Sequence, residues 1–409
     1  MRTIIAAYVA ALVLLLGLAA VGGAVLYDSR GPSDAIEAAA GGHEYSLTSF
    51  ELRNFPQKWL YKAGSFLTGR DSGNDDTLRR YFQLGSRIQA LEPQGETPEL
   101  QSLRDERASL LNRVEDIIEG RVTSVLEDQG MAMRFPLFSD LGLIFPPVDT
   151  KVASPPRVLV VSPRERIEQA RSYLLSPGLD EQTVEQIERD AEAAQLANEF
   201  PHGVSALVVN TGGLSTYPSQ VSDLDSYESL IDTVFHEWTH SYLAFYPLGS
   251  RYFQSNELRT LNESVANLAG HAMAALYFQR YGHLERQSVP APSATSAPYP
   301  LPPPAFDFTT ELPDLRRQVE ALLSAGQTGQ AETLMNQKRA EFQAHGIYIR
   351  KLNQAYFAFH GFYADTPGSI DPIGPRLQSL LDRAGSPGEF LRRASQLTSR
   401  ADLEALAGG

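Results

Sequence analysis

The sequence predicts an α+β fold that is predominantly α-helical. Long stretches before residue 130 and after residue 311 repeat their apolar residues at the three- and four-residue spacing of amphipathic helices. Two short apolar runs between them, R-V-L-V-V at 157–161 and V-S-A-L-V-V-N at 204–210, have the length and composition of buried strands. With 409 residues, the chain is long enough for two or three domains.

The first predicted element is a membrane anchor over residues 1–27. Residues 3–27 carry no charged side chain and exceed the roughly 20 residues that a helix needs to cross a bilayer. The apolar core of a cleaved signal is shorter, about 7–15 residues, and no clear cleavage site follows, so an uncleaved anchor is favoured. Arg2 before the segment and Asp28 after it favour an inside N-terminus. We therefore expect a single-pass protein of the cytoplasmic membrane whose remaining chain is extracytoplasmic.

A tether and a helical hairpin are predicted next. Residues 28–74 are mixed and rich in Gly, Ser and Asp, which is typical of a tether. Between 75 and 133, two helical stripes of apolar residues are separated by the turn sequence E-P-Q-G-E-T-P. This arrangement indicates an antiparallel helical hairpin. Either the hairpin is an arm that binds a protein partner, or it packs on the rest of the chain.

A central region over 134–286 and a C-terminal helical subdomain over 307–409 complete the organisation. In the central region we expect helices over 163–175 and 180–198 between the two strands. Residues 287–306 are too rich in proline for a helix or a central strand, and are interpreted as a loop or linker. The C-terminal subdomain has several helical segments, including one over 347–364.

The stretch T-V-F-H-E-W-T-H at 233–240 carries the strongest chemical signal. His236 and His240 are four residues apart, so on a helix they lie on one face, one turn apart. Two neutral imidazoles placed in this way can bind one metal ion. Glu237 lies beside the first histidine, where its carboxylate can take a proton from metal-bound water. The motif H-E-x-x-H therefore predicts a metal site with its own base.

A second helical pattern at about 255–281 contains Glu263 in the sequence N-E-S-V-A-N. Over about 233–271, the chain resembles the gluzincin metallopeptidases, the thermolysin-like and M1-aminopeptidase-like clan. In these enzymes H-E-x-x-H is followed, on the next helix, by a metal-binding Glu in an N-E-x-x-(A/S) setting. The resemblance implies one Zn²⁺ held by His236, His240 and Glu263 in a zincin-like catalytic domain with a small sheet. Bacterial membrane-associated aminopeptidases are similar in outline.

The resemblance also implies roles for residues outside the motif. Gluzincins stabilise the oxyanion with a Tyr or His from the C-terminal helical part, and the candidates here are Tyr356, His360 and Tyr363, at helical spacing along one side. The alternative is that these residues only pack, because an aromatic stripe of this kind is usually part of a core. The edge strand that binds the substrate backbone in gluzincins would correspond to about 206–217, where two glycines permit close approach; a simple loop is the alternative.

Two further residues on the second helix are candidates for supporting the metal ligands. Asn267 stands where a thermolysin-like enzyme has an Asp that orients a ligand histidine. His271, eight residues after Glu263, projects from nearly the same face and would contact a ligand or the substrate, or else only pack.

The composition excludes some classes of function and of metal site. A net charge of −14 argues against nucleic-acid binding, and the absence of Cys leaves His and carboxylates as metal ligands. The leading hypothesis is a membrane-anchored zinc metallopeptidase that hydrolyses a peptide or protein substrate with zinc-activated water and Glu237 as general base. No G-x-M-E-N-like segment precedes His236, so endopeptidase and aminopeptidase both stay open. The alternative is a non-enzymatic helical membrane scaffold with a structural metal site, which would have no use for Glu237.

Overall fold

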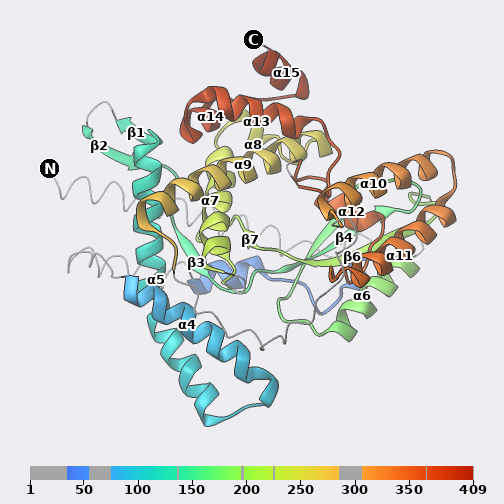
Figure 1. Cartoon of the computed structure of the whole chain (residues 1–409), viewed down its shortest axis with the longest axis horizontal. Coiled ribbons are helices and arrows are strands. Elements are labelled where there is room, and N and C mark those ends of the chain that lie inside the picture. Colours follow the sequence, from blue (N-terminus) through green and yellow to red (C-terminus); the bar gives the residue numbers. More distant parts are fainter. Residues whose placement is uncertain are drawn as a thin grey trace, which may run out of the picture.

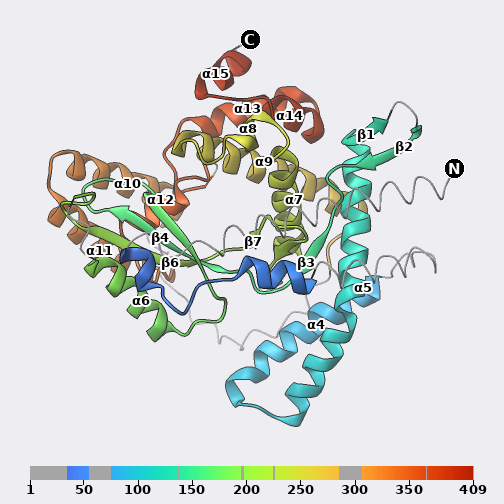
Figure 2. The same cartoon turned by 180° about the vertical axis from the view of Figure 1, so that it is seen from behind.

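The computed structural model describes residues 35–54, 75–135, 138–194, 198–223, 226–284, 306–364 and 366–408. Its described part is predominantly helical with small sheets, as predicted. Figure 1 shows helices α7 (Tyr227–Leu243) and α9 (Asn256–Tyr281) near the centre, with a helical hairpin on one side and a sheet with its helices on the other. The same arrangement is seen from behind in Figure 2.

The first described segment, residues 35–54, lies along the sheet side of the molecule. Its helix α2 (Ala35–Ala39) contacts α6 (Glu181–Ala193). The Tyr45 hydroxyl donates a hydrogen bond to Gln220 Oε1 at 2.8 Å. The predicted anchor over 1–27 lies outside the described residues. Within the described ranges, no helix combines the length and the apolar character needed to cross a membrane.

The hairpin consists of α4 (Asp75–Leu91), the short helix η1 (Glu92–Gln94) and α5 (Pro98–Asp128). Thr97 caps α5, because its side chain accepts a hydrogen bond from the Leu100 N–H at 3.1 Å. The distal end has its own small cluster of buried side chains: Leu84, Ile88, Leu100 and Leu103. The proximal end contributes to the main core, which also includes α7 and α9. The hairpin thus packs on the rest of the chain at one end and extends away at the other (Figure 1).

Three small sheets follow. Strands β1 (Ala132–Phe135) and β2 (Phe138–Ile144) form an antiparallel pair. The second sheet is antiparallel and has the strand order β5-β4-β6. Its strands are β5 (Arg171–Leu175), β4 (Arg157–Pro163) and β6 (Val204–Asn210). The predicted helix over 163–175 is therefore wrong: residues 171–175 pair with β4 through backbone hydrogen bonds, and alternate side chains are buried.

The third sheet lies beside α7. Its order is β3-β8-β7, with bounds Thr150–Val152, Ser219–Val221 and Gly213–Leu214. Two buried carboxylates of α5 cover the outer edge of β3: Glu119 accepts the Thr150 N–H at 2.8 Å, and Glu115 accepts the Val152 N–H at 2.9 Å. Strand β7 is the opposite edge of this sheet.

Six helices after the Pro-rich segment form the C-terminal part. Their bounds are α10 (Phe308–Ser324), α11 (Thr328–Ala344), α12 (Gln354–His360), α13 (Ile373–Ala384), α14 (Pro387–Ala394) and α15 (Arg400–Gly408). Helices α13 and α14 pack on α9, whereas α12 packs on β4 and β6. The predicted helix over 347–364 is shorter than expected. It begins only after Asn353, whose backbone is extended and whose side chain donates to Ala206 O at 3.0 Å. Most of the predicted loop over 287–306 lies outside the described residues.

Candidate metal centre

Helix α7 places the two histidines of the motif side by side. Ser226 caps its first turn by accepting the Ser229 N–H at 3.0 Å. The Trp238 indole, on the buried side of α7, donates to Pro146 O at 2.9 Å and so fixes the rotation of the helix. His236 and His240 consequently share one face, with their ring centroids 4.6 Å apart.

Helix α9 adds Glu263 to this face. The two helices approach closely at Gly270, where a Cβ atom would lie 3.3 Å from the His236 backbone nitrogen. The Glu263 Oε2 atom lies 3.6 Å from His236 Nε2 and 3.3 Å from His240 Nε2, and the two Nε2 atoms are 3.0 Å apart. A tetrahedral zinc site with bonds of about 2.0–2.1 Å requires ligand atoms about 3.3 Å apart. The three donors are therefore already spaced for one small cation.

Electrostatics also favour a cation between these groups. Burial opposes a charge on His240, but the Glu263 carboxylate outweighs this effect and raises the His240 pKa to about 9. Burial likewise opposes the charge of Glu263, yet the two histidines hold its pKa well below the ordinary range. The site thus stabilises a positive charge next to Glu263, as a bound metal ion would supply. One carboxylate and two imidazoles, with no thiolate in the chain, fit a zinc ion, but other divalent cations accept the same donors.

Two neighbours orient the metal donors. Asn262 Oδ1 lies 2.7 Å from His240 Nδ1, so this nitrogen donates its proton to the amide oxygen and leaves Nε2 facing Glu263. The Tyr252 hydroxyl donates a hydrogen bond to Glu263 Oε1, the oxygen that is turned away from the histidines. Neither role was predicted. Asn262 adjoins Glu263 in the sequence, which is a usable signal, but Tyr252 lies in the loop before α9, where spacing carries no information.

The predicted base, Glu237, is buried against the edge strand β7. A Cβ atom on Gly213 would lie 2.7 Å from Glu237 Cγ and 2.8 Å from its Cδ, so only glycine leaves room for this side chain. Ser215, just after β7, donates its hydroxyl to the Glu237 backbone oxygen at 3.2 Å. Burial raises the pKa of the Glu237 carboxyl above its ordinary value. The carboxylate, the three donors and a strand edge therefore occupy one location.

Of the three aromatic candidates from the C-terminal part, Tyr363 lies beside the metal donors. Its ring centroid is 6.3 Å from that of His236. The buried Ser264 hydroxyl accepts the Ala364 N–H at 3.0 Å and donates to Phe362 O at 3.1 Å, so it holds the backbone on both sides of Tyr363.

The other two aromatic candidates lie together on α12. The rings of Tyr356 and His360 are 4.3 Å apart, and Tyr356 packs against the apolar side chains of the α10–α11 layer. Burial lowers the pKa of His360 to about 4, so the imidazole is neutral at pH 7.

The two candidate supporting residues lie further along α9. His271 Nε2 is 3.2 Å from Asp232 Oδ2, an acidic side chain one turn before His236 on α7, and the imidazole is more than half exposed. Asn267 is half-buried one turn after Glu263.

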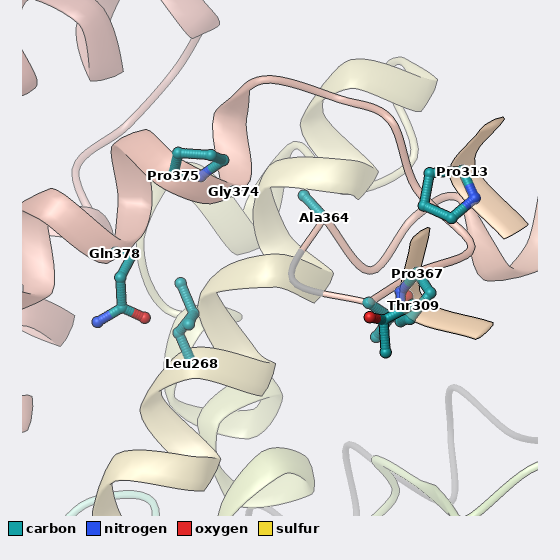
Figure 3. Close-up of a pocket in the computed structure, with 9 residues that line it drawn as sticks. Leu268, Thr309, Pro313, Ala364, Pro367, Gly374, Pro375 and Gln378 are labelled. Carbon is teal, nitrogen blue, oxygen red and sulfur yellow. The ribbon is translucent and has the colours of Figure 1, made fainter. Parts of the chain in front are cut away.

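A surface hollow of about 500 Å³ lies between α9, α10 and α13 (Figure 3). It is lined by Leu268, Thr309, Pro313, Ala364, Thr366, Pro367, Gly374, Pro375 and Gln378. None of the three metal donors lines it, so this hollow is separate from the candidate metal centre.

No match identifies the chain. It matches no protein-family model, no curated protein and no solved structure. The function of the site is therefore inferred from its geometry. His236, His240 and Glu263 are a group that could hold one metal ion, with ligand atoms within 4.8 Å of one another.

Proposed function

We propose that the chain is a zinc metallopeptidase of the gluzincin type, anchored in the cytoplasmic membrane with its catalytic domain extracytoplasmic. The observation that supports this most is the position of Glu237: a buried carboxylate next to three metal donors and in contact with the edge strand β7. A purely structural metal site needs the donors but has no use for a carboxylate that binds no metal. The arrangement supports hydrolysis over the alternative of a scaffold with a structural metal.

The chain supplies four functions in this proposal. His236, His240 and Glu263 would hold the ion, which when bound supplies a Lewis acid that polarises a peptide carbonyl and acidifies water. Glu237 would accept a proton from the attacking water and pass it to the leaving amine, a task for which a raised pKa is suited. Tyr363 would donate a hydrogen bond to the oxyanion. Strand β7, an edge of its sheet within the described residues, would pair with the substrate backbone, as extended peptides do at exposed strand edges.

The deciding experiment replaces the base. In Glu237→Gln the amide cannot accept a proton, so we expect peptide hydrolysis to fall by about 10²–10⁴-fold while zinc content is retained. Cleavage of a mixed peptide library, followed by mass spectrometry, gives the activity, and elemental analysis gives the zinc content. Glu257→Gln is the matched control, because Glu257 is an exposed carboxylate on α9 that accepts the Arg400 N–H at 3.1 Å. Hydrolysis by the Glu237 variant at the rate of this control would rule out the proposed mechanism.

A further inference from the structure

The guanidinium of Arg259 lies among three aromatic rings, here called the aromatic cage, near the candidate metal centre. Its guanidinium carbon lies 5.2 Å from the ring centroid of Tyr252, 5.9 Å from that of Phe253 and 5.1 Å from that of Phe362. These rings come from two places, the loop before α9 and the segment after α12. Contacts of this kind attract a guanidinium to the faces of the rings. The Arg259 residue is half-buried.

The aromatic cage leaves the hydrogen-bonding groups of Arg259 unused. A guanidinium has five N–H donors in its plane, and rings that approach at these distances accept none of them as an oxygen would. Within the described ranges, the Arg259 side chain makes no hydrogen bond, and no carboxylate lies within 4.0 Å of it. Other arginines of this acidic chain do form ion pairs; Arg350 and Arg400, for example, pair with Glu188 and Asp371. Arg259 thus presents a positioned, unpaired fork of donors.

Arg259 is also close to the proposed reaction centre. It precedes Glu263 by one turn of α9, and Tyr252, which contacts its guanidinium, donates its hydroxyl to that ligand. Phe362 adjoins Tyr363 in the chain. The Tyr252 ring is 5.2 Å from the guanidinium carbon and 6.2 Å from the His240 ring, which places the guanidinium no further than about 11 Å from that ligand. An extended peptide covers this largest distance in about three residues, at roughly 3.4 Å each.

We propose that Arg259 binds a carboxylate of the peptide substrate, within about three residues of the bond that is cleaved. The inference rests on the proposed function and specifies its substrate class. A planar fork of donors matches a carboxylate with two parallel hydrogen bonds, and the half-buried position strengthens them relative to a fully exposed pair. The carboxylate is either the C-terminal α-carboxylate or an Asp or Glu side chain, and the two sources share this chemistry.

The test measures binding to the zinc-loaded full chain in detergent, and it does not depend on turnover. The probes are short peptide hydroxamates, whose zinc-binding group fixes the register, in two series that extend from this group in opposite directions. Each series includes a free C-terminal carboxylate, its amide, and an amidated pair with Glu or Gln at the second or third residue. We expect a carboxylate in one series to bind about 10- to 100-fold more tightly than its uncharged counterpart. Whether the free terminus or the Glu side chain gives the gain identifies the source.

Variants of Arg259 then separate recognition from structural support. Arg259→Met keeps most of the apolar stem and should abolish the preference, whereas Arg259→Glu should reverse it in favour of a Lys-containing peptide. Arg259→Lys keeps the charge, loses the fork, and should retain a reduced preference. Zinc content and melting temperature are recorded for each variant, and Arg259→Lys serves as the reporter if Arg259→Met does not fold.

Two outcomes would overturn the inference: equal binding of the carboxylates and their uncharged counterparts by the wild type, or an unchanged ratio in the Arg259 variants. A role limited to holding Tyr252 and Phe362 would weaken all probes alike, which also overturns it. The proposed function fails separately, if a preference is present but peptides of the same register are not hydrolysed.

Discussion

Gly213→Ala tests whether the packing of strand β7 on Glu237 matters for catalysis. The new methyl carbon would lie 2.7 Å from Glu237 Cγ, whereas carbon atoms in favourable contact are about 3.5–4.0 Å apart, so the carboxylate side chain must move by about 1 Å. A displacement of about 1 Å in a catalytic group costs on the order of 10²-fold in rate. The backbone at this position is not in the left-handed region, so alanine adds no strain of its own.

Gly212→Ala is the matched control for this experiment. A Cβ atom there would meet Thr233 Oγ1 at 3.5 Å, an ordinary contact, so activity should be close to that of the wild type. Overpacking next to Glu237 should lower the stability of Gly213→Ala by about 1–3 kcal/mol. The assays are kcat/KM on a cleaved peptide, zinc content, and a thermal melt, all at a temperature where both variants are folded. Equal kcat/KM for the two variants would refute the view that β7 positions the base.

Three further predictions follow. Tyr363→Phe should lower kcat by about 10²–10³-fold at unchanged zinc content, as for the loss of an oxyanion donor; an unchanged kcat in steady-state assays would remove Tyr363 from the mechanism. Glu263→Ala should release zinc and Glu257→Ala should retain it, and elemental analysis showing the reverse would contradict the donor set. Burial and nearby Asp149 raise the pKa of Glu51 from 4.5 to about 7, against the effect of a hydrogen bond from Tyr217 N–H. The protonated Glu51 carboxyl is therefore accommodated below pH 4.5, and the stability of the wild type falls as pH rises through 7 and the group ionises. In thermal melts, Glu51→Gln should be about 1–3 kcal/mol more stable than the wild type at pH 8 and equally stable at pH 4.5. Equal stability of the two proteins at both pH values would contradict this environment.

The metal helices could be predicted from the sequence because local rules determine them. The H-E-x-x-H spacing has meaning only on a helix, and the second helix was expected over about 255–281, where the structure has Asn256–Tyr281. Strand β5 is not predicted from the sequence, because residues 171–175 form a strand by pairing with β4. The local spacing of apolar residues does not reveal this pairing. The position of Tyr252 also depends on tertiary packing alone.

The choice among the three C-terminal aromatics illustrates the same limit. Helical spacing placed Tyr356, His360 and Tyr363 on one side of a single helix. However, α12 ends at His360, so Tyr363 leaves the stripe and its ring lies beside His236 of α7. The helix end is fixed by contacts with Ser264, about one hundred residues earlier in the chain, which no periodicity reveals.

The Ser264 contacts also bear on how the protein is made. The residues that Ser264 binds lie 98 and 100 positions further along the chain, so the segment that carries Tyr363 can dock only after this part of the chain has been synthesised. A chain that emerges N-terminus first would present its metal donors well before this docking. Under the proposed function, the site would lack its oxyanion donor until this docking, while the chain's own unfolded segments are the nearest available substrates. Under the proposed function, full activity would then arise only after the C-terminal part has folded.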